Sequence, residues 1–281
     1  MLKQRVITAF ILLLILLPAL FYRSPVPFCF IALLMIATGA WEWARLNGCG
    51  QSASLLFGVV CISACSAAWY VGMLDQSLTL LWTLAGALWV LAGAWVLRRG
   101  VDAWSTYPRA IRLVLGLFTL WLAWLAVAQA RVIGINFLFS ILMLVWVADV
   151  FAYFAGRAFG GRFSRSKLAA SISPGKSWEG VWGGMAGVVA LAFVWQWLDV
   201  AWSVAVPSLY SHLGHQGVIL MLIAVVFMAA MSVVGDLVES LVKRSAGAKD
   251  SSGLLPGHGG ILDRVDALLP TLPLAMLLYS V

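Results

Sequence analysis

Long apolar runs alternate with short polar segments along this chain. Runs of about 20 residues with few or no charges recur from the first residues to the last. A helix of that length crosses about 30 Å of hydrocarbon. The pattern predicts about nine membrane-spanning helices, at residues 6–22, 26–41, 54–73, 78–97, 112–130, 132–152, 181–198, 217–235 and 266–281. The expected fold class is therefore an all-α, polytopic integral membrane protein.

Composition supports this fold class. Of the 281 residues, 63% are hydrophobic and 10% are charged, unlike the balance of a soluble domain. The first apolar run follows basic residues, as in a signal peptide, but no clean small-x-small cleavage site comes after it, so we interpret it as an uncleaved first span. Cys29, Cys49, Cys61 and Cys65 have no metal-type spacing and are expected to be inert thiols in or beside spans.

Basic residues are distributed unevenly between the two sides of the predicted membrane. With nine spans, 16 of the 18 Lys and Arg residues fall in the N-terminal segment or in the loops after the even-numbered spans. Only Arg23 and Arg131 fall on the other side. Since basic residues concentrate in cytoplasmic loops, the N-terminus is predicted to be cytoplasmic.

The net charge of +7 belongs to these cytoplasmic loops. It is either a topology signal alone or a surface that meets anionic headgroups or nucleotides. A nucleic-acid partner is not expected, because the basic residues are scattered over short loops and no nucleic-acid-binding motif accompanies them.

Acidic residues divide the chain into two regions. Residues 1–140, with about five spans, hold three of the 11 carboxylates and are predicted to be a transmembrane scaffold or a means of forming a homodimer. Residues 141–281 hold the other eight and are predicted to be catalytic. In the first region, Glu42 and Arg45 lie three apart at the end of a span among Trp residues. Glu42 is therefore interpreted as an interfacial anchor, and its change to Gln is expected to be nearly silent.

Two acids of the second region, Asp149 and Asp236, fall within apolar spans, where an ionisable residue is a functional hypothesis by default. Asp236, Glu239, Ser240 and Lys243 have the spacing of one helical face. This polar face is either a salt-bridged helix end or the wall of a polar cavity.

The segment KDSSGLLPGHGGILDRVD, residues 249–266, is unusually polar for this chain. Its glycines allow tight turns and close approach of backbone N–H groups to an anion, and a helix is expected to start just after them. Asp236 and Asp263, on two helices, suit Mg²⁺, and Lys243, Arg244, Lys249 and Arg264 supply positive charge for a polyphosphate. The alternative of a solvated loop is kept for Ser251 and Ser252.

The predicted cytoplasmic loop at 161–180 contains GKS, but Ala170 stands where a Walker A motif needs Gly, and no strand precedes it. We interpret it as a polar loop able to close over a nucleotide through Ser173, Lys176, Ser177 and Glu179. The small residues of GRAFGG, 156–161, indicate close contact between helices.

The residues from Ser240 to Asp266 closely resemble the signature of the phosphatidate cytidylyltransferase family, also called CDP-diacylglycerol synthases. The resemblance covers 27 residues with every fixed position filled. ADVFAYFAGRAFG, 148–160, and SISPGKSWEG, 171–180, are similar to two further blocks of the family. That family usually has two basic residues after the Ser-Pro; here Gly175 stands in the first place and only Lys176 is basic, so no role is carried over to position 175.

The resemblance implies that CTP and phosphatidic acid, a membrane lipid, react to CDP-diacylglycerol and pyrophosphate. The reaction would use Mg²⁺, alone or with a second cation, at the cytoplasmic face of a bacterial-type inner membrane. Metal binding is assigned to Asp236 and Asp263. Phosphate contacts and catalysis are assigned to Lys243, Arg244, Lys249, His258 and Arg264, with Asp250 and Asp266 as orienting residues or further ligands. Substrate binding is assigned to Asp149, Ser173, Lys176, Glu179, Ser240, Gly259 and Gly260.

Three other classes of protein are alternatives to a phosphatidate cytidylyltransferase. A transporter or channel is possible for a polytopic protein with buried acids, but here the carboxylates cluster towards one face. A CTP-dependent polyprenol kinase would share the metal and triphosphate features. A CDP-alcohol phosphotransferase is not expected, because its Asp-Gly-x-x-Ala-Arg motif is absent.

Overall fold

The computed structural model describes residues 2–164 and 166–280. Arg165, one of the basic residues counted above, lies outside this part, as do the side chains of Lys3 and Arg5. The described chain is helical almost throughout, and its only strand-like pairing is an isolated bridge between Leu255 and Gly259. The all-α prediction is confirmed.

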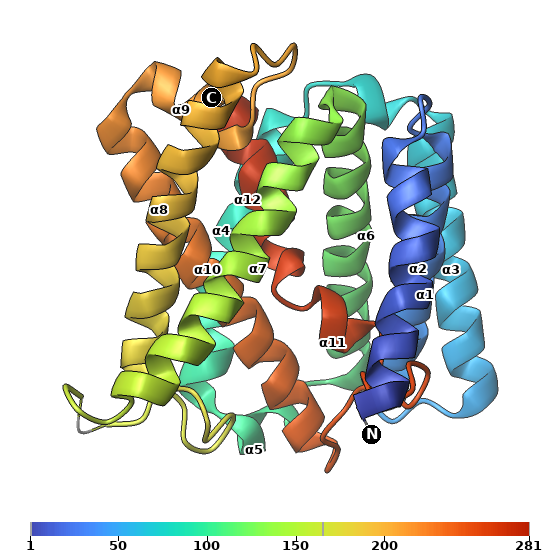
Figure 1. Ribbon diagram of the computed structural model, residues 1–281. Helices are drawn as coiled ribbons and strands as arrows, with labels where there is room; N and C mark the ends of the chain where they lie inside the picture. Colours follow the sequence, from blue (N-terminus) through green and yellow to red (C-terminus); the bar gives the residue numbers. More distant parts are fainter. Residues whose placement is uncertain (1, 165, 281) are drawn as a thin grey trace.

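The helices form one bundle (Figure 1). Seven of them are long and apolar enough to cross a membrane: α2 (Val26–Leu46), α3 (Gln51–Tyr70), α4 (Thr79–Arg99), α6 (Arg109–Ile133), α7 (Ile135–Phe159), α8 (Trp178–Ala201) and α10 (Val218–Ser245). The remaining elements are α1 (Leu2–Phe21), η1 (Met73–Asp75), α5 (Val101–Trp104), α9 (Leu209–Gln216), α11 (Leu262–Val265) and α12 (Leu268–Ser280).

Each predicted span falls on one of these helices, and most bounds agree to within a few residues, but α7 and α10 continue past the predicted ends at 152 and 235 to Phe159 and Ser245. The first and last spans correspond to the 20-residue α1, whose apolar part is Val6–Phe21, and to the 13-residue α12, and neither is among the seven. A total of nine crossings stays a prediction. The N-terminus and the loops after α2, α7 and α10 lie at one end of the bundle, and the C-terminus and α9 lie at the other (Figure 1). The predicted alternation of loops is therefore seen, and which end faces the cytoplasm stays a prediction.

Helices α7 and α8 lie in close contact along much of their length. A Cβ atom on Gly184 of α8 would meet the carbonyl oxygen of Ala148 of α7 at 2.8 Å. At the end of α7, a Cβ on Gly156 would meet Ser177 Oγ, the N-cap of α8, at 3.3 Å. The close helix contact predicted from GRAFGG is confirmed, and it holds loop 160–177 near the end of both helices.

The short helix α11 and the start of α12 lie against the middle of α10 (Figure 1). Gly235 makes this approach possible, because a Cβ there would meet the Cδ atom of Pro270 at 2.8 Å and would also clash with the carbonyl oxygen of Asp266. The polar face predicted for α10 therefore meets α11. Helices α4 and α6 of the first region pack on α12, so the two regions share one core.

Candidate active site

The segment that joins α10 to α11 folds into a tight turn. The Leu255 N–H donates to the Gly259 carbonyl at 2.9 Å, and the His258 N–H donates to the Leu255 carbonyl at 2.8 Å. Gly257 and Gly259 have φ angles of 78° and 81°, which glycine adopts at little cost. The turn predicted from PGHGG is confirmed, and α11 begins at Leu262 directly after it.

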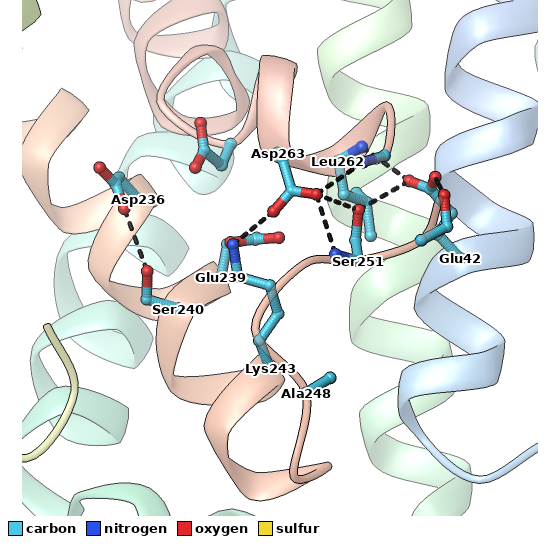
Figure 2. A network of polar contacts seen from close by, with 12 residues as sticks. Glu42, Asp236, Glu239, Ser240, Lys243, Ala248, Ser251, Leu262 and Asp263 are labelled. Atoms are coloured by element: carbon cyan, nitrogen blue, oxygen red, sulfur yellow. Dashed lines mark hydrogen bonds and ion pairs between the residues drawn. The ribbon is translucent and has the colours of Figure 1, made fainter. Parts of the chain in front are cut away.

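Asp263 of α11 joins both ends of this segment to α10 (Figure 2). Its Oδ2 atom accepts hydrogen bonds of 2.8 Å from the Ser251 and Gly260 N–H groups, and its Oδ1 atom accepts one of 2.5 Å from Lys243 Nζ. Burial alone would raise the pKa of Asp263, but the hydrogen bonds from Lys243, Gly260 and Ser251 outweigh it and hold the pKa below its ordinary value. Both carboxylate oxygens are thus engaged within the protein.

Glu42 of α2 holds the same segment from the other side (Figure 2). Its fully buried carboxylate accepts hydrogen bonds from the N–H groups of Ile261, at 3.0 Å, and Leu262, at 2.7 Å. The Ser252 hydroxyl donates to it at 2.5 Å, and the Ser251 hydroxyl lies 2.8 Å from Asp263 and 3.2 Å from Glu42. These bonds compensate the burial of the carboxylate.

Two predictions are therefore wrong. Glu42 is not an interfacial anchor, because it is inside the bundle and no ion pair joins it to Arg45 among the described residues. Ser251 and Ser252 are not residues of a solvated loop, because Ser251 is buried and both hydroxyls contact carboxylates. The signal that could have revealed Glu42 was the one applied to Asp149: an ionisable residue in an apolar run.

Gly260 approaches protein side chains rather than open space. A Cβ at this position would clash with Ser251 Oγ and Glu42 Oε1, and its N–H already donates to Asp263. The sequence assigned this glycine to backbone contact with phosphate. The structure instead places it where only a hydrogen side chain lets the three polar groups meet.

Lys243 lies between two carboxylates of the cluster (Figure 2). Its Nζ atom is 2.5 Å from Glu239 Oε2 and 2.5 Å from Asp263 Oδ1, and its side chain is only 10% exposed. Ser240 donates to Asp236 at 3.2 Å on the same helix. The predicted polar face of α10 is confirmed, but its lysine neutralises protein carboxylates instead of pointing to solvent.

Asp236 faces a separate polar cavity of about 430 Å³ between α7, α8 and α10. Lys176, from loop 160–177, reaches it with a 2.6 Å ion pair to Asp236. Asp149 lines the same cavity, as the sequence predicted, together with Arg157 and Ser177. A volume of this size is in the range of about 300–1,000 Å³ that small-molecule ligands occupy.

The other predicted residues take several positions. Glu179 is buried and accepts hydrogen bonds from the N–H groups of Phe163 and Ser164, so it supports the loop and does not line the cavity. Ser173 also lies away from the cavity lining. The Arg244 side chain donates to the carbonyls of Ile172 and Ala248.

The remaining predicted residues are exposed, partly buried beside α12, or in the lining of a second cavity. Lys249 and Asp250 are exposed. Asp266 is partly buried just before α12, and its carboxylate accepts a hydrogen bond of 2.7 Å from the Ala267 N–H. His258 and Arg264 line a different, apolar cavity next to α1.

The metal prediction rests on Asp236 and Asp263. Among the described residues, no three His, Cys, Asp or Glu side chains are grouped so that they could enclose an ion by themselves. Both carboxylate oxygens of Asp263 accept hydrogen bonds from protein donors. The Asp236 side chain, in contrast, is about one-third exposed in the polar cavity. Glu239 is buried, and neither of its carboxylate oxygens has a hydrogen-bond partner there besides its ion pair. The two carboxylates that line the polar cavity, Asp149 and Asp236, fit a cation whose remaining ligands come from a substrate.

The fold and the site together define a polytopic membrane protein with an interior cluster of carboxylates and basic residues beside a ligand-sized cavity. The family model described as "Cytidylyltransferase family" matches residues 3–281, and the chain belongs to this family. A phosphatidate cytidylyltransferase of Pseudomonas aeruginosa is 39% identical over 100% of this chain and 98% of its own length. One of Haemophilus influenzae is 35% identical over 99% of each, and one of Thermotoga maritima is 39% identical over 50% of this chain and 48% of its own.

Proposed function

We propose that this protein is a phosphatidate cytidylyltransferase, which transfers CMP from CTP to phosphatidate. The observation that carries the proposal is that the segment 240–266 folds into one cluster beside the polar cavity, in a chain similar over its full length to proteins of that name. The reaction is a nucleotidyl transfer within the family to which the chain belongs.

The chemistry requires no activated protein nucleophile. A phosphate oxygen of phosphatidate forms a bond to the α-phosphorus of CTP, and the bond from that phosphorus to the oxygen bridging to the β-phosphate breaks. The products are CDP-diacylglycerol and pyrophosphate. The attacking group is already an anion, so the protein must bring two anions together, align the attack and stabilise the leaving pyrophosphate.

The polar cavity is the proposed site for the triphosphate of CTP. Lys176 and Arg157 line it with positive charge, and the N-terminus of α8 opens into it at Ser177. Lys176 now pairs with Asp236, and a bound triphosphate would compete for that lysine. This arrangement lets the nucleotide exchange one ion pair for another.

Asp236 is the proposed ligand for Mg²⁺, with Asp149 adding negative charge in the same cavity. The ion would neutralise charge on the triphosphate and polarise the α-phosphate. Asp263, in contrast, would keep the signature turn in position beside the cavity through Lys243, Gly260 and Ser251. We place the site at the cytoplasmic face of a bacterial inner membrane, because the basic loops gather at this end of the bundle.

The experiment is a radiolabel transfer with the purified protein in detergent, phosphatidate and Mg²⁺. We expect label from α-³²P CTP to enter the lipid and label from γ-³²P CTP to leave as pyrophosphate. Label from the γ-phosphate in the lipid would identify a kinase instead. No labelled lipid, together with ion flux in vesicles, would identify a transporter.

A further inference from the structure

A second cavity, here named the apolar chamber, lies between the first helices and the signature segment. It has a volume of about 510 Å³. Helices α1, α2, α6, α7 and α12 all contribute to its wall, for example through Leu16, Ala32, Val127, Leu142 and Leu272. The chamber is thus shared between the region predicted to be a scaffold and the region predicted to be catalytic.

The polarity of the chamber changes from one end to the other. Of the described residues that line it, only His258 and Arg264 are basic or otherwise strongly polar, and both belong to the signature segment. Arg264 is exposed and forms no ion pair with another described residue. The buried Nδ1 atom of His258 has no hydrogen-bond partner in that same part of the chain. The signature segment therefore brings two nitrogen groups without a protein partner among the described residues to the wall of an otherwise apolar volume.

The chamber opens sideways, between α1 and α7. Leu13 and Leu17 of α1 and Trp146 of α7 line it and are 45%, 41% and 48% exposed. In Figure 1, α11 is visible between these two helices. An apolar opening in the side of a membrane-spanning bundle faces lipid chains, so a ligand could enter from the bilayer.

Contacts connect the chamber to the rest of the site. The Thr8 hydroxyl of α1 donates to the Pro256 carbonyl at 3.0 Å, which ties the wall of the chamber to the PGHGG turn. At the other side, Arg264 follows Asp263 in α11, and Asp263 accepts the hydrogen bond from Lys243 of α10. Arg264 therefore lines the apolar chamber and lies next to the residue that joins α11 to α10, the helix that carries Asp236 of the polar cavity.

We propose that the apolar chamber holds an acyl chain of the phosphatidate substrate, with the lipid phosphate at Arg264 and His258. This inference rests on the proposed function and adds the position of the lipid. An acyl chain is apolar along its length and ends near an anionic headgroup, which matches the polarity of the chamber. Helices α1, α2 and α6 would then contact substrate in addition to supporting the fold.

The experiment compares long-chain and short-chain phosphatidate with two adjacent variants of α1. Leu16 lines the chamber, whereas Ile15 is 49% exposed and does not line it. We expect Leu16→Trp to lower kcat/KM for dioleoyl phosphatidate about tenfold while changing it less than about twofold for dihexanoyl phosphatidate, which needs little of the chamber. Ile15→Trp should leave the ratio of the two substrates as in the wild type.

Other outcomes separate the two proposals. If the wild-type protein converts neither lipid, the proposed function fails. If it converts both and Leu16→Trp lowers both equally while its unfolding temperature is unchanged, the acyl-chain proposal is overturned.

A crosslinking experiment covers the case in which Leu16→Trp does not fold. Phosphatidate with a diazirine at the end of one chain should label α1 and α2 of the wild-type protein, and unlabelled phosphatidate should suppress the labelling. Equal labelling by the matching phosphatidylcholine, which has the same chain but is not the substrate, would show that bulk lipid occupies the chamber and would overturn the proposal.

Discussion

The carboxylate of Glu42 in α2 accepts a 2.7 Å hydrogen bond from the backbone N–H of Leu262, 220 residues later in the chain. This bond attaches the second helix to the first residue of α11, one position before Asp263. A residue of the N-terminal region thereby determines where the signature segment lies. Its role is to position the segment, since its oxygens accept hydrogen bonds from the Ile261 and Leu262 N–H groups and from the Ser252 hydroxyl.

Replacing Glu42 should therefore impair the enzyme. Glu42→Gln keeps the size of the side chain, but in either orientation its amide N–H₂ meets a backbone N–H donor, of Ile261 or Leu262, and an unpaired buried donor costs about 1–3 kcal/mol. We expect a lower unfolding temperature and a reduced rate of CMP transfer. Asp102→Asn is the matched control, because Asp102 is an exposed acid of the same region. Wild-type activity and stability in Glu42→Gln would contradict the positioning role.

The hydrogen bond between Ser252 and Glu42 should appear as coupling in a double-mutant cycle. Ser252→Ala removes the contact and Glu42→Gln weakens it by removing the charge, so their combined effect on the free energy of unfolding should be less than the sum by about 0.5–3 kcal/mol. Denaturant unfolding in detergent measures this. Ser105→Ala, at an exposed position after α5, should be additive with Glu42→Gln. An additive Ser252 pair would mean that the contact contributes nothing.

Removing the ammonium group of Lys243 should destabilise the cluster strongly. Lys243→Met leaves Glu239 and Asp263 buried without their shared cation, and breaking a buried pair in this way costs about 3–5 kcal/mol. The measurement is thermal unfolding in detergent, with the exposed Lys167→Gln as control. A small change, similar to that of the control, would show that Lys243 is free to serve substrate phosphates instead.

Asp236 and Asp263 should differ when each is changed to Asn. Asp236 makes one ion pair and is about one-third exposed, so Asp236→Asn should keep its unfolding temperature but need more Mg²⁺ for half-maximal CMP transfer. Asp263 accepts bonds from three residues, so Asp263→Asn should lower the unfolding temperature as well as the rate. A Mg²⁺ titration and thermal unfolding of both variants test this. An unchanged Mg²⁺ requirement in Asp236→Asn would refute its assignment as the metal ligand.

Local patterns predicted much of this site. The spacing of Asp236, Glu239, Ser240 and Lys243 placed them on one helical face, because four residues within two turns have a known geometry. The PGHGG turn was equally local. The partners of these groups were not predictable in the same way: Lys243 was assigned to phosphate, and its position between two carboxylates depends on α11 packing against α10.

Hydropathy by itself determined that this chain forms apolar helices and which loops share a side, because the thickness of the hydrocarbon sets the length of each run and charge is excluded from it. The signature motif by itself determined which residues to examine. Only the tertiary structure decided that Glu42 supports the signature segment, that Ser251 and Ser252 are internal, and that an apolar chamber ends at Arg264. The hydrogen bonds of Glu42 join residues up to 220 positions apart, and no local period or propensity encodes which buried acceptor meets which distant donor.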